Sequence, residues 1–192
     1  MHLLSKTLIA VAGLSLLAGC APATVGAGAA GATAVARESR TIGTLIDDQL
    51  IELKASSAIS NDAELSAQAH INITSYNFII LLSGEAPTEA LRSKAEQIVR
   101  EQPKVRRVHN KITIAAPSST LTRASDVSLT TRVKAVFIGD EQIAADRVKV
   151  VSENGVVYLM GLVTQAEAKR ATELTSGVSG VQRIVQLFEI TD

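Results

Sequence analysis

The chain of 192 residues carries 19 basic and 19 acidic side chains, so it has no net charge with which to attract nucleic acid. Hydrophobic residues make up 46% of the sequence, which is enough for a packed core in one or two small domains. Because there is one cysteine, Cys20, an intramolecular disulfide is excluded and stability has to come from packing.

The chain begins with features of a lipoprotein signal peptide. Lys6 is followed by an apolar run from Leu8 to Leu17 that is too short to span a bilayer. The ending Leu-Ala-Gly-Cys looks like a lipobox, so we predict that residues 1–19 are removed and that Cys20 is acylated and anchors the chain in a membrane. Ala21, rather than an aspartate, indicates the periplasmic face of the outer membrane. The alternative is an ordinary secretory signal with a chance cysteine.

Residues 20–40 are predicted to form a lipidated tether. The segment is almost entirely alanine, glycine, threonine and valine, and it has no amphipathic period with which to close a core. An alanine-rich helix lying on the bilayer is the alternative, although three glycines oppose helix formation.

Two stretches of the chain repeat one another. Ile71–Gly84 resembles Val148–Gly161, each with two apolar strands around a polar turn and a glycine at the end. Asn154-Gly155 is a strong signal for a type I′ hairpin turn, and residues 75–77 are the corresponding turn of the first copy. We therefore assign structural roles to four residues: Gly84, Gly161, Asn154 and Gly155.

Each hairpin is preceded by a predicted helix, at 47–59 and 128–138, and followed by another that starts after Thr88 or Thr164. Glu167 completes a capping box with Thr164. An alternating strand closes each copy. The predicted fold is α+β, with two tandem αββαβ domains at 41–115 and 126–192, a linker at 116–125, and in each domain a small three-stranded mixed sheet packed on two helices. Such small domains are expected to pack together.

This order of elements, with Gly84 and Gly161 after the second strands, resembles the BON domain. The signal, the tether and the stretches 153–164 and 178–181 further resemble the dual BON-domain outer-membrane lipoproteins of the DolP family. The resemblance implies a non-enzymatic envelope protein that binds anionic phospholipid, notably phosphatidylglycerol, through its second domain. It also implies a role in outer-membrane integrity, at division sites and under envelope or osmotic stress.

In that family the first helix of the second domain contacts lipid, and this chain has Ser128 where relatives have tryptophan. The candidate phospholipid-binding residues are Leu129, Thr130, Arg132, Val133, Lys134, Val136 and Phe137. Leu129 and Arg132 are the favoured candidates, with apolar insertion and phosphate contact as their roles. The alternative for Val133, Val136 and Phe137 is packing on the sheet.

Other chemistry is not indicated by the sequence. His70 and His109 lack partners at metal-ligand spacing, so we predict no metal and no cofactor. Asp47-Asp48 is interpreted as the start of a helix rather than as paired carboxylates. Nucleophile-elbow and phosphate-loop motifs are absent, so no catalytic residue is predicted. A basic run at 100–111 is either a solvated face or a contact for acidic lipid.

The rival function is a protein-interaction scaffold. In that case the paired domains would hold a partner in outer-membrane protein assembly, peptidoglycan remodelling or cell division, and lipid contact would be incidental. An envelope hydrolase would require a clustered serine, histidine and aspartate.

Overall fold

The computed structural model describes residues 40–191, which fall within one compact unit from Arg37 to Asp192. The predicted signal peptide, Cys20 and all but the last residue of the tether lie outside the described residues. The first domain contains α2 (Ile42–Asn61), α3 (Ala63–Gln68), β1 (His70–Tyr76), β2 (Ile79–Ala86), α4 (Glu89–Arg100), β3 (Arg107–Asn110) and β4 (Thr113–Ile114). The second contains α5 (Thr120–Ile138), η1 (Ala145–Arg147), β5 (Val148–Glu153), β6 (Val156–Val163), α6 (Gln165–Ser176) and β7 (Arg183–Ile190).

Each domain has a mixed sheet with its second strand, β2 or β6, in the middle. β1 and β2 are antiparallel, whereas β3 and then β4 pair in parallel with successive parts of β2. In the second domain β5 and β6 are antiparallel, and β6 and β7 are parallel. The structure therefore confirms the α+β fold with two tandem αββαβ units, and adds the short helix α3 between α2 and β1.

The first helix of each domain begins earlier than the sequence predicted. Thr41 caps α2 and Ser119 caps α5, each by accepting a hydrogen bond from the backbone N–H three residues ahead. The first turns of both helices contain no buried residue, so the apolar pattern of the buried face did not mark them. As a result, α5 occupies part of the segment 116–125 that was predicted as a linker. The caps at Thr88 and Thr164, including the capping box with Glu167, are confirmed.

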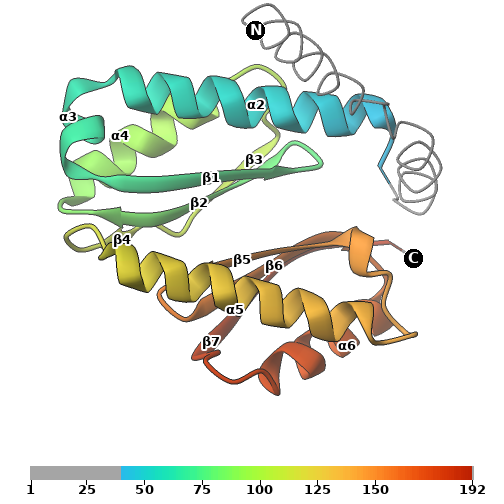
Figure 1. Cartoon of the computed structure of the whole chain (residues 1–192). Coiled ribbons are helices and arrows are strands. Elements are labelled where there is room, and N and C mark those ends of the chain that lie inside the picture. Colours follow the sequence, from blue (N-terminus) through green and yellow to red (C-terminus); the bar gives the residue numbers. More distant parts are fainter. Residues whose placement is uncertain (1–39, 192) are drawn as a thin grey trace, which may run out of the picture. The chain divides into compact units, whose positions relative to one another are not determined.

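Strand β2 is buried along its whole length because both faces of its sheet are covered. Ile80 and Leu82 belong to a core with α2 and α4. Ile79 and Leu81 point the other way, into a second core shared with the other domain. Figure 1 shows the helices α2 and α4 on the outer side of this sheet. Alternation along one apolar strand thus supplies two cores at once.

The second domain is built in the same way. Val157 and Leu159 of β6 pack with α5 and α6, whereas Tyr158 and Met160 join the core shared with the first domain. The two sheets consequently face each other with the helices outside. This shared core confirms that the two small domains pack together.

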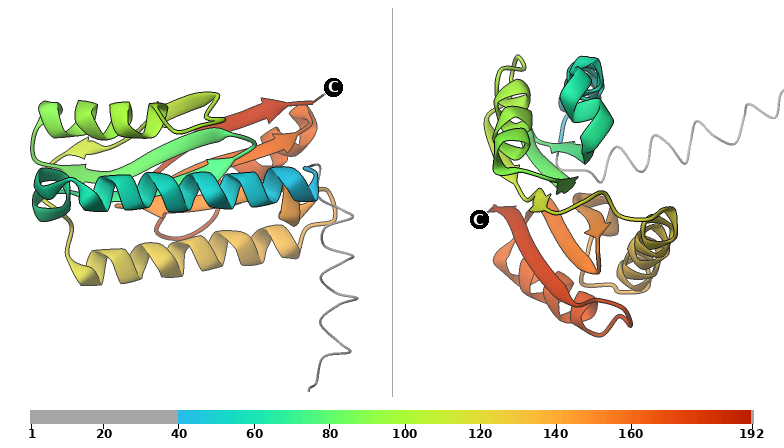
Figure 2. Two further views of the ribbon diagram at one scale, coloured as in Figure 1. Left: turned by 90° about the horizontal axis from the view of Figure 1, so that it is seen from above. Right: turned by 90° about the vertical axis from the view of Figure 1, so that its left-hand side faces the viewer.

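The edge strands β1 and β5 lie on one side of this arrangement, and their covering helices follow them. Both views in Figure 2 place α2 and α5 along that side. A contact between Glu52 of α2 and Lys149 of β5, 4.0 Å apart, crosses between the domains there. One side of the molecule therefore presents the first helix of both domains.

Candidate functional site

Three of the predicted lipid-binding residues are core residues. Leu129, Val133 and Phe137 expose 3%, 0% and 1% of their surface and pack with β5, β6 and α6. Their four-residue spacing places them on the face of α5 that meets the sheet. The prediction that these three side chains contact lipid is therefore wrong, and the alternative of packing on the sheet holds for Val133 and Phe137.

Thr130 lies on the side of α5 that is turned toward β5 of its own domain. Its hydroxyl donates to Ser152 Oγ at 2.8 Å. It lines an open hollow of about 310 Å³ between α5 and the edge strands, together with His70, Asn72 and Glu153. Its polar group is satisfied inside the protein, so it offers little to a lipid headgroup.

Arg132, Lys134 and Val136 are accessible. Arg132 lies on the surface and donates to Ser128 Oγ at 2.8 Å and to the carbonyl oxygen of Ser179 at 3.3 Å. Lys134 is exposed, and Val136 exposes 37% of its surface. Two more exposed apolar residues, Val127 at 68% and Ile138 at 78%, lie on the same side of α5 as Lys134. Sequence reasoning did not find Val127 and Ile138, because apolar residues off the periodic face look the same as core residues in the sequence.

The exposed charge of α5 has one sign. Arg123, Arg132 and Lys134 are its basic residues, and its one carboxylate, Asp126, exposes 7% of its surface. Asp126 accepts backbone hydrogen bonds from Asn154, at 2.9 Å, and from Gly155, at 3.1 Å. Because that carboxylate is turned inward, the outer surface of α5 is cationic and partly apolar.

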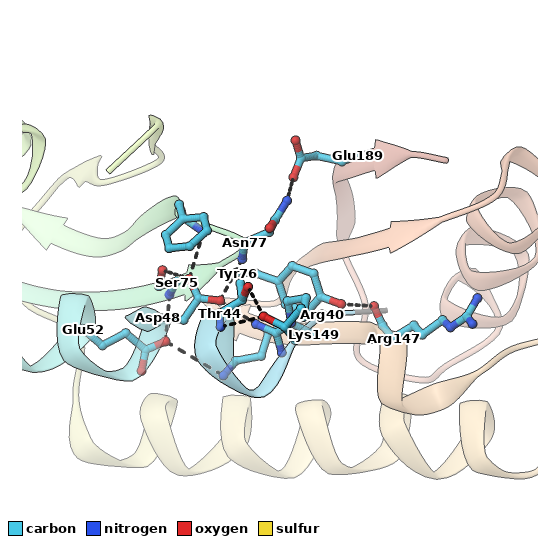
Figure 3. A network of polar contacts seen from close by, with 12 residues as sticks. Arg40, Thr44, Asp48, Glu52, Ser75, Tyr76, Asn77, Arg147, Lys149 and Glu189 are labelled. Atoms are coloured by element: carbon cyan, nitrogen blue, oxygen red, sulfur yellow. Dashed lines mark hydrogen bonds and ion pairs between the residues drawn. The ribbon is translucent and has the colours of Figure 1, made fainter. Parts of the chain in front are cut away.

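Asp48 of α2 makes the equivalent contact in the first domain, with more partners. Its carboxylate accepts hydrogen bonds from Ser75 Oγ at 2.6 Å and from the backbone N–H groups of Asn77 and Phe78 at 2.8 and 2.9 Å. Figure 3 shows these contacts around the first hairpin turn. Arg40 pairs with the same carboxylate at 2.7 Å. Each domain therefore ties its hairpin turn to its first helix through a buried aspartate.

This position of Asp48 overturns the helix-start interpretation of Asp47-Asp48. Helix α2 begins at Ile42 and has no acidic residue in its first turn. Asp47 instead lies beside Lys104, with 2.7 Å between Oδ2 and Nζ. A signal for the true role was present in the repeat, since Asp48 precedes Asn77 by 29 residues and Asp126 precedes Asn154 by 28.

The hairpin turns have the backbone that the sequence indicates. Asn154 and Gly155 both have positive φ, 48° and 73°, as a type I′ turn requires. In the first domain the two positive values fall on Asn77 and Phe78, one residue further along than the predicted turn. Gly84 and Gly161 lie inside β2 and β6 rather than after them, where the neighbouring strand approaches closely.

Two buried carboxylates lie at the contact between the domains. Glu153 exposes 6% of its surface and accepts a hydrogen bond from Asn72 Nδ2 at 2.8 Å. Glu85 exposes 2% and accepts hydrogen bonds from the Asn154 side chain and from the backbone N–H of Ser118, the latter at 3.2 Å. These contacts make the relative placement of the two sheets specific as well as apolar.

Burial raises the pKa of Glu153; the hydrogen bond from Asn72 opposes the rise, and the charges of Glu85 and Asp126 add to it. The folded protein therefore holds the proton of the Glu153 carboxyl more tightly than the unfolded chain does. The free energy of unfolding consequently falls as the pH rises from 4.5, the ordinary pKa of a glutamate, through the raised pKa of the folded state. We expect Glu153→Gln to raise the free energy of unfolding at pH 7 by about 1 kcal/mol, because glutamine keeps an oxygen for Asn72 without the charge.

Urea unfolding at pH 4 and pH 7 measures this effect. The difference between Glu153→Gln and the unaltered protein is expected to shrink towards zero at the lower pH. Glu141→Gln, at an exposed position, is the matched control and should change stability equally little at both. A variant less stable than the parent at pH 7 would show that the ionised carboxylate is favoured where it lies.

Residues 40–191 contain no cluster of three or more histidine, cysteine or acidic side chains placed to hold a metal ion. Among the helices of this same part of the chain, none is both long enough and apolar enough to cross a bilayer.

Paired αββαβ domains with mixed sheets, each turn held by an aspartate from the first helix, define the class of this protein. The model of the BON domain family matches residues 47–116 and 125–192. The chain thus belongs to the BON-domain family and carries two copies of the domain.

Similarity to known proteins narrows the position of the chain within the BON-domain family. It is 36% identical to the outer membrane lipoprotein DolP of Haemophilus influenzae, over 98% of this chain and 97% of that protein. A 21 kDa hemolysin of Actinobacillus pleuropneumoniae is 31% identical over 79% of the chain and 78% of its own length. The osmotically inducible protein Y of Escherichia coli is 28% identical, over 74% and 72% respectively. The chain is a dual BON-domain lipoprotein of the DolP family, lipid-anchored at the periplasmic face of the outer membrane.

Proposed function

We propose that this protein, acylated at Cys20, binds anionic phospholipid through the outer surface of α5 and thereby supports outer-membrane integrity, with phosphatidylglycerol as the expected lipid and division sites or envelope stress as the setting. The function requires no catalytic site. The observation that carries it is the charge of α5, whose basic residues Arg132 and Lys134 are exposed while its only acidic residue is buried.

The contact differs from the one predicted from the sequence. Arg132 and Lys134 stay as phosphate-binding groups, because a basic residue near an anionic surface gains about 1 kcal/mol. Arg132 is held by hydroxyl and carbonyl oxygens rather than by a carboxylate, so its charge is available to a phosphate. Val127, Val136 and Ile138 replace the buried Leu129, Val133 and Phe137 as the apolar part of the contact. Binding would thus combine two charges with shallow apolar insertion.

The weak site gains from the lipid anchor. An anchored chain keeps α5 near the membrane, so a low intrinsic affinity suffices for occupancy. The site would then select which lipid lies beneath the protein rather than whether the protein is bound at all.

The test uses the segment from Arg37 to Asp192, which forms one compact unit, with vesicles of phosphatidylcholine containing or lacking phosphatidylglycerol. We expect stronger binding to the anionic vesicles than to the neutral ones. Arg132→Gln together with Lys134→Gln should lower affinity by roughly tenfold or more, since two charges near the surface are removed. Binding by the unaltered segment should weaken with salt, and binding by the double variant should depend on salt much less.

Lys169→Gln with Arg183→Gln is the matched control. These substitutions remove two exposed charges that belong to α6 and β7 rather than to α5. If this pair lowers affinity as much as the α5 pair, the attraction is a property of the total charge and not of α5. If neither vesicle is bound, the chain would instead be a scaffold for an outer-membrane assembly or cell-division protein, detectable by crosslinking from the same helix.

A further inference from the structure

Helix α2 carries a line of large apolar side chains that stay exposed among the described residues 40–191. Ile42, Ile46, Leu50 and Leu53 expose 62%, 55%, 44% and 67% of their surfaces. Their spacing of four, four and three residues places them along one side of the helix. The opposite side carries the buried residues Asp48, Ile51, Ala55 and Ile59. We refer to the four exposed residues as the α2 stripe.

The fold does not require this stripe, as the second domain shows. Asp48 and Asp126 hold the equivalent hairpin turns, so they align α2 with α5. The positions that match the stripe in α5 are Thr120, Ala124, Ser128 and Thr131, all of which are exposed. An equivalent helix in an equivalent domain thus has a small or polar residue at each of these positions. The apolar character of the α2 stripe therefore serves something outside the domain.

The charges around the stripe favour a lipid surface as the partner. α2 contains three carboxylates, and none of them joins the stripe: Asp48 is buried, Asp47 pairs with Lys104, and Glu52 accepts a hydrogen bond from the backbone N–H of Ser75 at 2.7 Å. Lys54, next to Leu53, is exposed. An apolar line flanked by an exposed lysine, with its carboxylates engaged elsewhere, is suited to the boundary between headgroups and acyl chains.

We propose that the α2 stripe inserts into the headgroup boundary of the phospholipid bilayer to which the chain is anchored. The proposal rests on the proposed function in two respects, the acylation of Cys20 and the contact of α5 with the membrane. Only 21 residues lie between Cys20 and Ile42, so α2 is the first described element after the anchor. It also runs along the same side as α5 (Figure 2), so a bilayer that meets α5 lies beside α2 as well.

The two helices would have different tasks. The stripe supplies apolar contact that does not depend on headgroup charge, whereas α5 supplies cationic contact that does. Leu50 takes the place in α2 that Ser128 takes in α5, so the first domain has a large apolar residue where the second has a small polar one.

The single cysteine of the chain makes a direct test practicable. In the acylated protein the Cys20 sulfur is consumed, so a cysteine introduced by Leu50→Cys is the one free thiol and can carry a polarity-sensitive fluorophore. In vesicles of phosphatidylcholine we expect a blue-shifted emission and strong quenching by quenchers attached to the acyl chains. Leu53→Cys should behave alike. Ser128→Cys, the equivalent position of α5, is the matched control and should be quenched mainly by a water-soluble quencher.

Other occupants of the stripe would give other results. A label at Leu50 that is shielded in detergent without lipid, and more so as protein concentration rises, would show that a second copy covers the stripe and would overturn the proposal. A label exposed to water under both conditions would overturn it too.

A second set of variants separates this proposal from the function proposed for α5. Replacing the stripe by its α5 counterparts, Ile42→Thr, Ile46→Ala, Leu50→Ser and Leu53→Thr, should leave the fold intact, because α5 tolerates those residues. In the unacylated Arg37–Asp192 segment we expect vesicle binding to fall at least tenfold, equally at low and high salt. The Arg132 and Lys134 variant should lose only the salt-sensitive part. If the stripe variant binds vesicles as well as the parent, the proposal for α2 is overturned. If the Arg132 and Lys134 variant does so, the proposal for α5 is overturned instead.

Discussion

Replacing Asp48 by alanine is expected to lower the free energy of unfolding by about 3–5 kcal/mol. The carboxylate exposes 2% of its surface and receives hydrogen bonds from a serine hydroxyl and two backbone N–H groups of the first turn. Its removal leaves these donors buried and unsatisfied, and it leaves the Arg40 guanidinium without the carboxylate that it pairs with at 2.7 Å. Equilibrium unfolding in urea measures the loss.

Asp47→Ala is the matched control for this prediction. The two residues are neighbours in α2 and carry the same charge, but the Asp47 carboxylate pairs with Lys104, whose side chain is 58% exposed. An exposed pair of this kind contributes little, so the control should change stability by no more than about 0.5 kcal/mol. Equal effects from the two substitutions would mean that the turn does not depend on Asp48.

The loss should extend to the contact between the domains. Arg40 lies over the Tyr76 ring, with 3.7 Å from its guanidinium carbon to the ring centroid. The Tyr76 hydroxyl donates to the carbonyl oxygen of Arg147 at 3.0 Å, and Asn77 Nδ2 donates to Glu189 at 2.6 Å. Displacement of the turn would therefore disturb both domains (Figure 3). Faster amide exchange in β5 and β7 of the Asp48→Ala variant is the expected sign.

Gly84→Ala is expected to destabilise the protein by at least about 3 kcal/mol. Gly84 has a φ of 107°, a value that residues with a Cβ rarely adopt. A Cβ at this position would also overlap the carbonyl oxygen of His70 on the neighbouring strand β1. Because that oxygen belongs to the backbone, relief would need a shift of β1, which forms part of the core under α2.

Two other glycines calibrate this effect. At Gly161 a Cβ would lie 2.5 Å from the carbonyl oxygen of Arg147, but φ there is not positive, so Gly161→Ala should cost less than Gly84→Ala. At Gly139, at the end of α5, the nearest atoms would be 3.7 Å away, and Gly139→Ala should be nearly neutral. Thermal unfolding of the three variants gives the ranking. If Gly84→Ala left the stability unchanged, β1 would have to shift without any loss of free energy of unfolding.

Much of the architecture was predictable from local patterns. The Asn154-Gly155 turn, the caps at Thr88 and Thr164 and the repeated strand pairs were read correctly because each depends on residues close together in the chain. The repeat itself showed that one fold occurs twice. Helix starts were predicted less well, because the first turns of α2 and α5 add no residue to the buried apolar face of either helix.

The candidate site was only partly predictable. The apolar residues of α5 have the composition of a lipid-binding helix, and nothing local distinguishes the buried Leu129 from the exposed Val127 or Ile138. Similarly, Asp48 looked like a residue at the start of a helix until the hairpin turn was placed beside it. Both assignments depend on which neighbour, far away in the sequence, occupies each side of the helix.

By itself the sequence determined the two αββαβ units, the lipobox that predicts the anchor, and the balance of charge, because these depend on residue type and short-range spacing. The tertiary structure decided which apolar residues form the core and which form the α2 stripe. It also decided which carboxylates are buried at the turns and between the domains. The physical reason is that burial is a property of packed surfaces: a side chain loses its water only when a distant segment covers it, and no local pattern specifies that segment.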